Sequence, residues 1–308
     1  MKFNTLFPAF FFLQKNLQKT KSKWHTVGMK KKLTETAVFL ISVLSALFFT
    51  ACKTPPVITP GGEISIQQIH RSILYERYTI PSSAVEVHLV TVDLSDPEIK
   101  ICTLPAENAA LRSGKTPEWL NAESTAGFAE RTKSIVAVNA TPFKYYADSR
   151  LFFFIKKQKP VGLFISDGQL ISEPVERYGA LCFTKDKTAY VLTSQTDELR
   201  EDTETALGGF FVTLKDGSFF GDWKEIYDSR TAAGVSKDGK ILYILCAEGK
   251  SSARNGLTFY ESTAILKEKG AWTVIQMDGG SATSLFIQGK LAAGTRRAAV
   301  NHLGITED

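Results

Sequence analysis

The stretch that decides the fold of this 308-residue chain reads Met277-Asp278-Gly279-Gly280-Ser281-Ala282-Thr283-Ser284. The β-branched run just before it, residues 273–275, predicts a buried strand. That strand ends at Asp278, where two glycines free the backbone and small hydroxylated residues follow. A carboxylate at a strand end, beside backbone N–H groups and hydroxyls, is typical of sites for oxygen-rich ligands. An ordinary Asp-Gly turn is the alternative interpretation.

The composition is that of a globular protein, with 44% hydrophobic and 22% charged residues. The formal net charge of +5 comes from residues 1–32, which hold eight lysines and no acidic residue. The rest of the chain carries 29 basic and 32 acidic residues, a net charge of −3. Because the sequence indicates no basic face, we do not expect nucleic acid as a partner.

Residues 1–51 are predicted to be an upstream extension followed by a lipoprotein signal peptide. A run of lysines at 30–32 precedes an apolar segment at 37–49, and small residues then lead to Cys52. This pattern is similar to a bacterial lipobox, which implies a lipid on Cys52 and an extracytoplasmic, membrane-anchored protein. An uncleaved transmembrane anchor is the alternative, although the apolar run is short for a full span.

Residues 52–63 are expected to form a linker, since they contain three prolines and two glycines. Residues 64–308 would then form one domain. Its three cysteines, Cys102, Cys182 and Cys246, lie in apolar runs without Cys-x-x-Cys spacing. The sequence therefore predicts no metal cluster and no cofactor, and buried free thiols are expected, with one disulfide as the alternative.

Hairpins dominate the predicted secondary structure. Asp-Gly at 167–168, 216–217 and 238–239, and Lys-Asp-Lys at 185–187, each separate two apolar runs. Helices are predicted over residues 121–133 and 258–269, and each leads into an apolar strand that ends on a polar residue. We therefore expect a single α/β (α+β) domain with a mixed, hairpin-rich β-sheet core flanked by a few helices.

Five short motifs follow one another at predicted strand ends and turns. They are Val138-Asn139-Ala140-Thr141-Pro142-Phe143, Ala206-Leu207-Gly208-Gly209-Phe210, Ser229-Arg230-Thr231-Ala232-Ala233-Gly234, Met277-Asp278-Gly279-Gly280-Ser281-Ala282-Thr283 and Asn301-His302-Leu303-Gly304-Ile305. In this order they resemble the phosphodiester glycosidase family over residues 80–307. The resemblance implies hydrolysis of a sugar joined through its anomeric carbon to a phosphodiester, and hence a carbohydrate or glycosyl-phosphate substrate. Thr141-Pro142 and Ser281 depart from the family pattern, which bears on substrate choice.

Four residues are predicted to act in catalysis. Asp278 and Glu248 would supply the two carboxylates that glycosidic cleavage requires. Arg230 would hold phosphate through its bidentate guanidinium, and Asn139 would bind a sugar hydroxyl or orient a carboxylate. Substrate binding is expected of Thr231, Gly279, Gly280, Ser281, Thr283 and Asn301. The four catalytic candidates each have a structural alternative: a turn cap for Asp278, a surface ion pair for Arg230, an exposed turn residue for Glu248 and a buried amide for Asn139.

Other polar residues are assigned more ordinary roles. Thr258 and Glu261 form a capping box, which explains Glu261 without a catalytic function. His302 could carry a proton, but a structural role is favoured, and Arg296-Arg297 is interpreted as a solvated pair with phosphate or membrane binding as alternatives. A non-catalytic glycan-binding lipoprotein is the rival function. A metal-dependent phosphodiesterase with Asp278 as ligand ranks third, because the sequence lacks a clustered ligand set.

Overall fold

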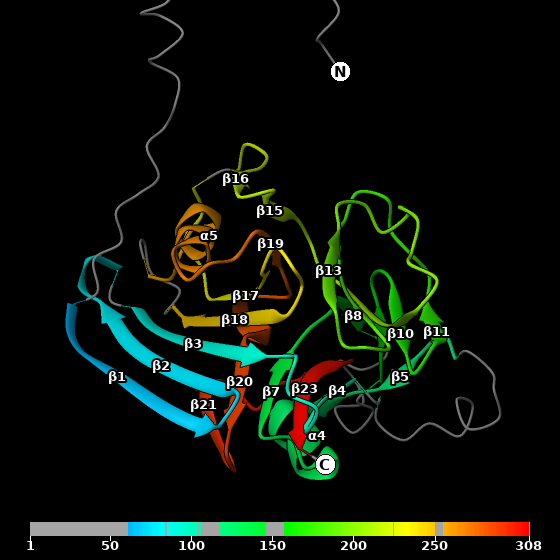
Figure 1. Ribbon diagram of the computed structural model, residues 1–308, viewed down its shortest axis with the longest axis horizontal. Coiled ribbons are helices and arrows are strands. Elements are labelled where there is room, and N and C mark those ends of the chain that lie inside the picture. The colour runs from blue at the N-terminus through cyan, green and yellow to red at the C-terminus, as the bar shows by residue number, and fades with distance from the viewer. Residues whose placement is uncertain are drawn as a thin grey trace, which may run out of the picture. The chain divides into compact units, whose positions relative to one another are not determined.

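Antiparallel β-sheets make up most of the computed structural model of this protein (Figure 1). The structure describes residues 61–83, 85–103, 105, 117–145, 157–223, 225–249 and 255–307. All of them belong to one compact unit, Pro55–Asp308. The predicted extension, signal peptide and lipidation residue Cys52 lie outside the described residues.

The largest sheet has eight strands and carries the centre of the fold. Its strands, in spatial order, are β1 (Gly61–His70), β2 (Ile73–Ile80), β3 (Val85–Asp93), β18 (Ile241–Glu248), β17 (Arg230–Val235), β19 (Thr273–Gln276), β15 (Val212–Lys215) and β16 (Ser218–Phe219). A short 3₁₀ turn, η1 (Pro81–Ser83), links β2 to β3. The central strands β17, β18 and β19 therefore have a neighbour on each side, and they are buried along most of their length.

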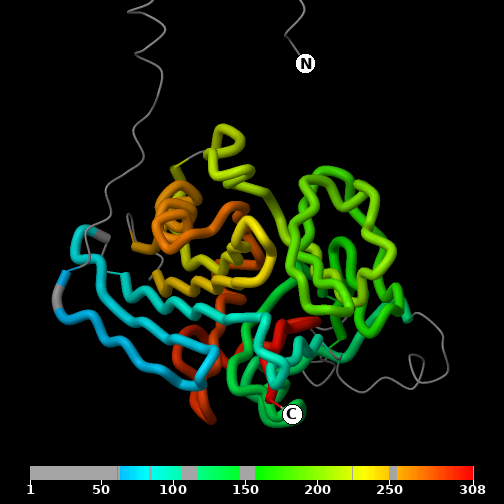
Figure 2. Tube along the Cα trace, viewed as in Figure 1, coloured from blue at the N-terminus to red at the C-terminus, as the bar shows by residue number. Residues whose placement is uncertain are grey.

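Two five-stranded sheets accompany the large one. One contains β11 (Gln169–Ser172), β10 (Phe164–Ser166), β14 (Thr203–Gly208), β12 (Ala180–Thr184) and β13 (Ala189–Leu192). The other contains β21 (Lys290–Gly294), β20 (Ser284–Ile287), β7 (Val136–Asn139), β23 (His302–Glu307) and β4 (Ile99–Cys102). Figure 2 follows the chain from the first hairpin, in blue, to β23, in red, which pairs with β7.

Short strands complete the structure. One small sheet pairs β22 (Ala298–Ala299) with β6 (Glu123–Ser124), and another holds β5 (Leu120–Asn121), β9 (Lys157–Pro160) and β8 (Phe143–Tyr145). Besides η1, the helices of the described residues are α4 (Thr125–Thr132), α5 (Phe259–Glu268) and the 3₁₀ turn η3 (Gly280–Ala282).

The expected α/β class with a mixed sheet was only partly right. Strands account for 51% of the structure, with two α-helices in the described part, so the fold is β-rich. Every strand pair identified among the described residues is antiparallel. The two helix–strand units misled the prediction because α4 leads into β7 and α5 into β19, and these strands belong to different sheets. Neither helix joins two parallel neighbours, as a βαβ unit would require.

The four predicted hairpins are confirmed. They are β10–β11, β12–β13, β15–β16 and β17–β18. In the first, Asp167 and Gly168 have φ angles of 50° and 72°, and in the third Asp216 and Gly217 have 52° and 72°. Two successive positive φ angles are what a tight hairpin turn needs, and Asp-Gly adopts them at low cost.

Both predicted helices form, with a later start for the first. The prediction began at residue 121, but residues 120–121 and 123–124 form short strands, and Ser124 caps α4 by accepting from the Gly127 N–H. The second helix matches its capping box. Thr258 Oγ1 accepts from the Glu261 N–H at 3.1 Å, and the Glu261 carboxylate accepts from the Thr258 N–H at 2.8 Å. The structural role assigned to Glu261 is thus confirmed.

Two apolar layers lie on opposite faces of the central strands. On one face, Val90 and Ile275 join Val138 and Leu285 of the β7–β20 sheet. On the other, Leu245 and Val274 pack with Leu266 of α5. Because side chains alternate along a strand, each residue of β17 faces either the β7 sheet or α5. This alternation decides which polar side chains meet at the strand ends.

No disulfide joins the three cysteines beyond the signal region; Cys182 and Cys246 are buried, as expected, and Cys102 is partly exposed. Among the residues that the structure describes, no helix has the length and apolar character needed to cross a bilayer.

Candidate active site

Strand ends from three elements meet around the Asp278 loop. The Asp278 N–H donates to the carbonyl of Ala140, which directly follows β7, at 2.9 Å. The Met277 N–H donates to the Thr231 carbonyl of β17 at 2.9 Å. These backbone bonds connect the eight-stranded sheet with the β7 sheet, so motifs far apart in the sequence converge here.

Asn139 holds this junction together. Its side-chain Oδ1 accepts from the Ser284 N–H at 2.9 Å and from Thr231 Oγ1 at 3.1 Å. Its Nδ2 donates to the Asp278 carbonyl at 2.5 Å. The amide is 1% exposed. With these three bonds, Asn139 positions the loop backbone. This placement matches the structural alternative given for Asn139 above, a buried amide.

The predicted hydroxyl ligands lie behind the loop. Thr231 and Thr283 are buried, and their hydroxyl oxygens are 3.4 Å apart. Ser281, by contrast, is exposed, and its carbonyl accepts from Thr295 Oγ1 at 3.3 Å. Of these three predicted substrate-binding hydroxyls, that of Ser281 is therefore the one that the structure leaves open to solvent.

The carboxyl group of Asp278 has an unusual environment. Burial raises its pKa from 3.8 to about 7, and the positive charge of Arg297 partly opposes this rise. Within the described part of the chain, its carboxylate oxygens take part in no hydrogen bond or ion pair. A carboxyl that exchanges its proton near neutral pH, without a partner that fixes it, is suited to general acid or base chemistry.

The two glycines shape the loop. Gly280 has a φ of +58°, and its N–H donates to the Ser229 carbonyl at 2.8 Å. A Cβ on Gly279 would lie 2.8 Å from the same carbonyl oxygen, so a side chain there would force the strands apart. The N–H of Gly280 is thus used inside the fold, and the role predicted for the two glycines as substrate donors stays untested.

A further carboxylate lies beside this turn and was not predicted. A Cβ on Gly280 would be 3.3 Å from Asp228 Oδ2, and Asp228 is exposed. The residue directly precedes the Ser229-Arg230-Thr231 motif, so its position next to a recognised motif was the available signal. Asp228 also forms backbone bonds with Leu257, which fix its own position.

Glu248 ends β18 on the face that also presents Thr231. Its carboxylate accepts from the N–H of Gly294, the last residue of β21. Burial raises the pKa of Glu248, and the charge of Glu86, its cross-strand partner on β3, raises it further. Glu248 and Asp278 are not hydrogen-bond partners in the described structure, and different charged residues perturb them. The predicted second carboxylate thus keeps a raised pKa, but its pairing with Asp278 stays a prediction.

Arg230 points to the opposite face of β17, toward α5. Its Nε donates to the Leu257 carbonyl at 2.8 Å, and its Nη2 donates to the Ile226 carbonyl. The guanidinium also lies 4.2 Å from the centre of the Phe259 ring. Burial lowers its pKa, and Asp228 and Glu261 oppose that effect. Phosphate binding by Arg230 stays a prediction, and this placement favours a structural role.

Arg297 is the cation that acts on Asp278. Its Nε donates to the Tyr145 hydroxyl at 2.7 Å, and its guanidinium lies 5.4 Å and 5.9 Å from the ring centres of Tyr145 and Phe143. The two rings meet edge to face. Phe143 belongs to a motif that the sequence singled out, whereas Arg297 was interpreted there as one of a solvated pair. The Arg-Arg dipeptide gave no indication of Tyr145 or Phe143 as partners, because they lie far away in the sequence.

Asn301 and His302 serve the interior. Asn301 Oδ1 accepts from the Thr141 N–H at 2.9 Å, and its Nδ2 donates to Thr141 Oγ1 at 3.0 Å, which fixes the loop after β7. His302 is 1% exposed and stacks on Phe128 at 4.9 Å. Burial lowers the pKa of His302 to about 3, so the ring is neutral near pH 7. The structural alternative for His302 is the one that fits this placement.

Comparison with solved structures identifies the fold. A hypothetical protein from Synechocystis aligns with 80% of this chain and 64% of its own, with a TM-score of 0.58 and 13% identity. The catalytic domain of zebrafish N-acetylglucosamine-1-phosphodiester alpha-N-acetylglucosaminidase, auto-inhibited by its pro-peptide, aligns with 80% of this chain and 88% of its own, with a TM-score of 0.57 and 19% identity. The architecture is thus of the class seen in that catalytic domain.

Sequence comparison gives the family. The phosphodiester glycosidase family matches residues 132–306, more than half of the chain, and the protein belongs to it. The resemblance inferred from the five motifs is thereby confirmed. The SPbeta prophage-derived uncharacterized protein YomE of Bacillus subtilis is 23% identical over 208 residues, which cover 60% of this chain. The aligned region covers 30% of the length of that relative.

Proposed function

We propose that this protein is a lipid-anchored, extracytoplasmic hydrolase that cleaves the glycosidic bond of a sugar-1-phosphodiester or a related glycan. The observation that carries the proposal is the carboxyl of Asp278, whose pKa of about 7 places its proton exchange at neutral pH, next to the charge of Arg297. Family membership supplies the reaction class. A carboxyl that can exchange a proton and a nearby cation that can bind phosphate are two of the groups that this reaction uses.

In this proposal Arg297 binds the phosphate of the substrate. Glycosidic cleavage with a phosphate leaving group depends more on stabilising negative charge than on protonating the leaving oxygen. The Tyr145 hydroxyl accepts from Nε and Nη2 of Arg297 and so fixes the plane of the guanidinium. The Nη1 side of the guanidinium group can then donate hydrogen bonds to phosphate oxygens.

Asp278 and Glu248 are assigned the carboxyl chemistry. The reaction requires one carboxyl that transfers a proton and a second that activates water or stabilises the sugar cation. Asp278 is suited to proton transfer because burial raises its pKa to about 7. Glu248, whose pKa is raised by burial and by Glu86 and which has one fixed partner in Gly294, is assigned the second function. Asn139 acts as a positioning residue that holds the Asp278 backbone.

The test is release of free sugar from a panel of sugar-1-phosphodiesters with a chromogenic aglycone. We expect turnover by the wild type, a loss of about 10²–10⁴-fold in kcat for Asp278→Asn, and a raised KM for Arg297→Gln. Arg296→Gln removes the same charge from an exposed neighbour and serves as the matched control. Wild-type turnover that is equally fast in Asp278→Asn would contradict the assignment of Asp278.

A non-catalytic glycan-binding lipoprotein is the rival function. It is distinguished in the same panel, since retained binding with no turnover of any phosphodiester by the wild type would favour it. A third alternative, a metal-dependent phosphodiesterase, requires activity that a chelator removes. Activity that survives chelation and depends on Asp278 would support the glycosidase proposal.

The anchor is tested separately. Cys52 is proposed to carry the lipid, with residues 53–60, which precede β1, as the linker that spaces the domain from the membrane. We expect the wild-type protein to incorporate labelled fatty acid and to partition into the membrane fraction, and Cys52→Ala to do neither. Membrane association that persists without label in Cys52→Ala would instead favour an uncleaved transmembrane anchor.

A further inference from the structure

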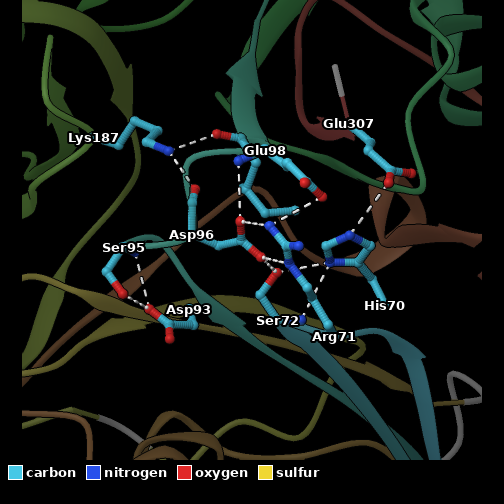
Figure 3. A network of polar contacts seen from close by, with 10 residues as sticks. His70, Arg71, Ser72, Asp93, Ser95, Asp96, Glu98, Lys187 and Glu307 are labelled. Atoms are coloured by element: carbon cyan, nitrogen blue, oxygen red, sulfur yellow. Dashed lines mark hydrogen bonds and ion pairs between the residues drawn. The ribbon is translucent and has the colours of Figure 1, made fainter.

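A second cluster of chemically capable side chains lies away from the Asp278 loop, where the first hairpin meets the end of the chain. His70 is the last residue of β1, Glu98 directly precedes β4, and Glu307 ends β23. Because Glu307 pairs with Ile99, the two glutamates come from neighbouring strands. Figure 3 shows both carboxylates extending toward the space beside the His70 ring.

The distances fit a metal ion. One potential ligand atom from each of the three residues lies within 4.8 Å of the other two. His70 Nε2 and Glu307 Oε1 are 3.5 Å apart. Bond lengths of about 2.0–2.2 Å around tetrahedral Zn²⁺ place its ligand atoms about 3.3–3.6 Å from one another. Some ligand atoms would have to move about 1 Å closer together to bind the ion. Rotation of the two glutamate side chains, which are half-exposed, can provide this movement.

Neighbouring groups orient the His70 ring. Its Nδ1 lies 2.7 Å from Ser72 Oγ, which donates to Asp96 Oδ2 at 2.8 Å. Asp96 is held in turn by Arg71, through Nε at 2.7 Å and Nη2 at 2.6 Å (Figure 3). A histidine ligand whose second nitrogen is bonded through a hydroxyl to a fixed carboxylate is the arrangement that sets its tautomer and aims its free nitrogen.

Two tautomers of His70 are compatible with these contacts. In one, Nδ1 accepts from the Ser72 N–H at 3.2 Å, and Nε2–H donates to Glu307. In the other, Nδ1–H donates to Ser72 Oγ, and Nε2 presents its lone pair to the two carboxylates. A metal ion selects the second, because a ligating nitrogen must be deprotonated.

The local charges favour a divalent cation. Glu98 and Glu307 are the carboxylates that face the proposed site, and Asp96 lies behind it. Arg71 bonds Asp96 through two nitrogens and approaches Glu98 Oε2 at 3.0 Å, which leaves Oε1 of Glu98 for a ligand. Lys187 is directed to the backbone carbonyls of Asp96 and Ile99 rather than to the glutamates.

We propose that His70, Glu98 and Glu307 bind a Zn²⁺ ion that fastens the β1–β2 hairpin to the terminal strand β23. One imidazole and two carboxylates suit Zn²⁺ better than Mg²⁺, which prefers an all-oxygen octahedron. The three ligands are far apart in the sequence and form no spacing motif, so the sequence predicted no metal here. The site is independent of the proposed glycosidase function, since none of its residues belongs to the Asp278 loop.

The test measures zinc binding by the full chain after a chelator has removed bound metal. Calorimetric titration gives the stoichiometry and affinity, and thermal unfolding gives the change in Tm. We expect one Zn²⁺ per chain, a rise in Tm that follows zinc concentration, and no rise with Mg²⁺. Ser72→Ala, which removes only the orienting hydroxyl, should weaken binding about 10–100-fold. No stoichiometric zinc binding by the wild type would overturn the proposal.

Two further variants keep the result specific. His70→Gln and Glu307→Gln should each abolish the zinc-dependent rise in Tm, and Glu307→Gln is informative even if the histidine variant misfolds. Glu63→Gln removes a carboxylate from an exposed position on the same strand β1 and should bind zinc normally. Equal zinc binding by His70→Gln and the wild type would place the ion elsewhere and reject this site.

Discussion

The charge of Arg297 acts on the partly buried carboxyl of Asp278 and limits how far burial raises its pKa. Arg297 comes from the segment between β21 and β22, and Asp278 from the loop after β19, so the fold brings the two residues together. Arg297 is itself held by Tyr145 of β8. The proton affinity of the candidate catalytic carboxyl is thus set jointly by its own burial and by a cation on a separate element.

Removal of Arg297 should shift the pH profile upward. Since the positive charge lowers the pKa of Asp278, Arg297→Gln leaves burial unopposed, and the pKa rises above about 7. We expect the pH–rate limb that reports Asp278 to move to higher pH in this variant, and to stay in place in Arg296→Gln. The measurement is kcat/KM against pH for all three proteins. A limb at the same pH in Arg297→Gln would show that the charge does not reach Asp278.

The same carboxyl should make stability depend on pH. Its pKa is raised from 3.8 to about 7 on folding, so the folded state favours the protonated form. The contribution of Asp278 is fully present below about pH 4 and is lost as pH rises through about 7. A shift of this size corresponds to a difference on the order of 4 kcal/mol.

Asp278→Asn removes this titration and isolates its effect. We expect the variant to gain stability relative to the wild type between pH 4 and pH 8, because the neutral amide avoids a buried charge. Chemical unfolding of both proteins at the two pH values measures the difference. A constant difference across that range would contradict the raised pKa.

Asn139 should matter to stability and to activity together. Asn139→Ala removes three hydrogen bonds and leaves the Ser284 N–H and the Asp278 carbonyl without their partner. An unsatisfied buried group costs about 1–3 kcal/mol. Thr231→Val removes the Thr231 hydroxyl, with its bond to Asn139 and its longer contact to Thr283 Oγ1, and should cost about 1 kcal/mol. Denaturant unfolding gives both values, and equal losses in the two variants would show that Asn139 is not the centre of the junction.

Glu86 offers a test of the second carboxylate. It is the cross-strand partner of Glu248, and its charge helps to raise the pKa of Glu248. Glu86→Gln should therefore lower the pKa of Glu248, which carbon-detected NMR titration of the glutamate side chains would measure. Glu63→Gln serves as a control far from β18. An unchanged pKa of Glu248 would mean that burial alone determines it.

Local patterns were predictable from the sequence because local chemistry fixes them. Asp167-Gly168 and Asp216-Gly217 adopt the positive φ angles of tight turns, and Thr258 with Glu261 forms the expected cap. The sheet type was not predictable in the same way, because strand partners are chosen by packing between distant segments. Asn139, predicted to bind a sugar hydroxyl or to orient a carboxylate, lies beside the Asp278 loop and bonds the Asp278 carbonyl.

Side-chain direction explains where the site prediction stopped. Arg230 and Thr231 are adjacent in one motif, yet alternation along β17 sends the first toward α5 and the second toward Asn139. Arg297, by contrast, was not predicted to act at the site, because nothing in the Arg-Arg dipeptide indicates that Tyr145 or Asp278 lies near it. The sequence therefore identified the loops of the candidate site, but it did not show which arginine side chain points toward Asp278.

A substitution at Arg230 separates the structural role from phosphate binding. Arg230→Met keeps much of the side-chain volume and removes the bonds to the Leu257 and Ile226 carbonyls and the stacking on Phe259. Hydrogen bonds from a charged group contribute about 1.5–3 kcal/mol each. We expect a lower free energy of unfolding, with the KM of the folded fraction unchanged for a sugar-1-phosphodiester. Thermal unfolding and steady-state kinetics below the Tm measure the two quantities. A raised KM with unaltered stability would instead assign Arg230 to the phosphate, and Arg297→Gln should then leave KM unaffected.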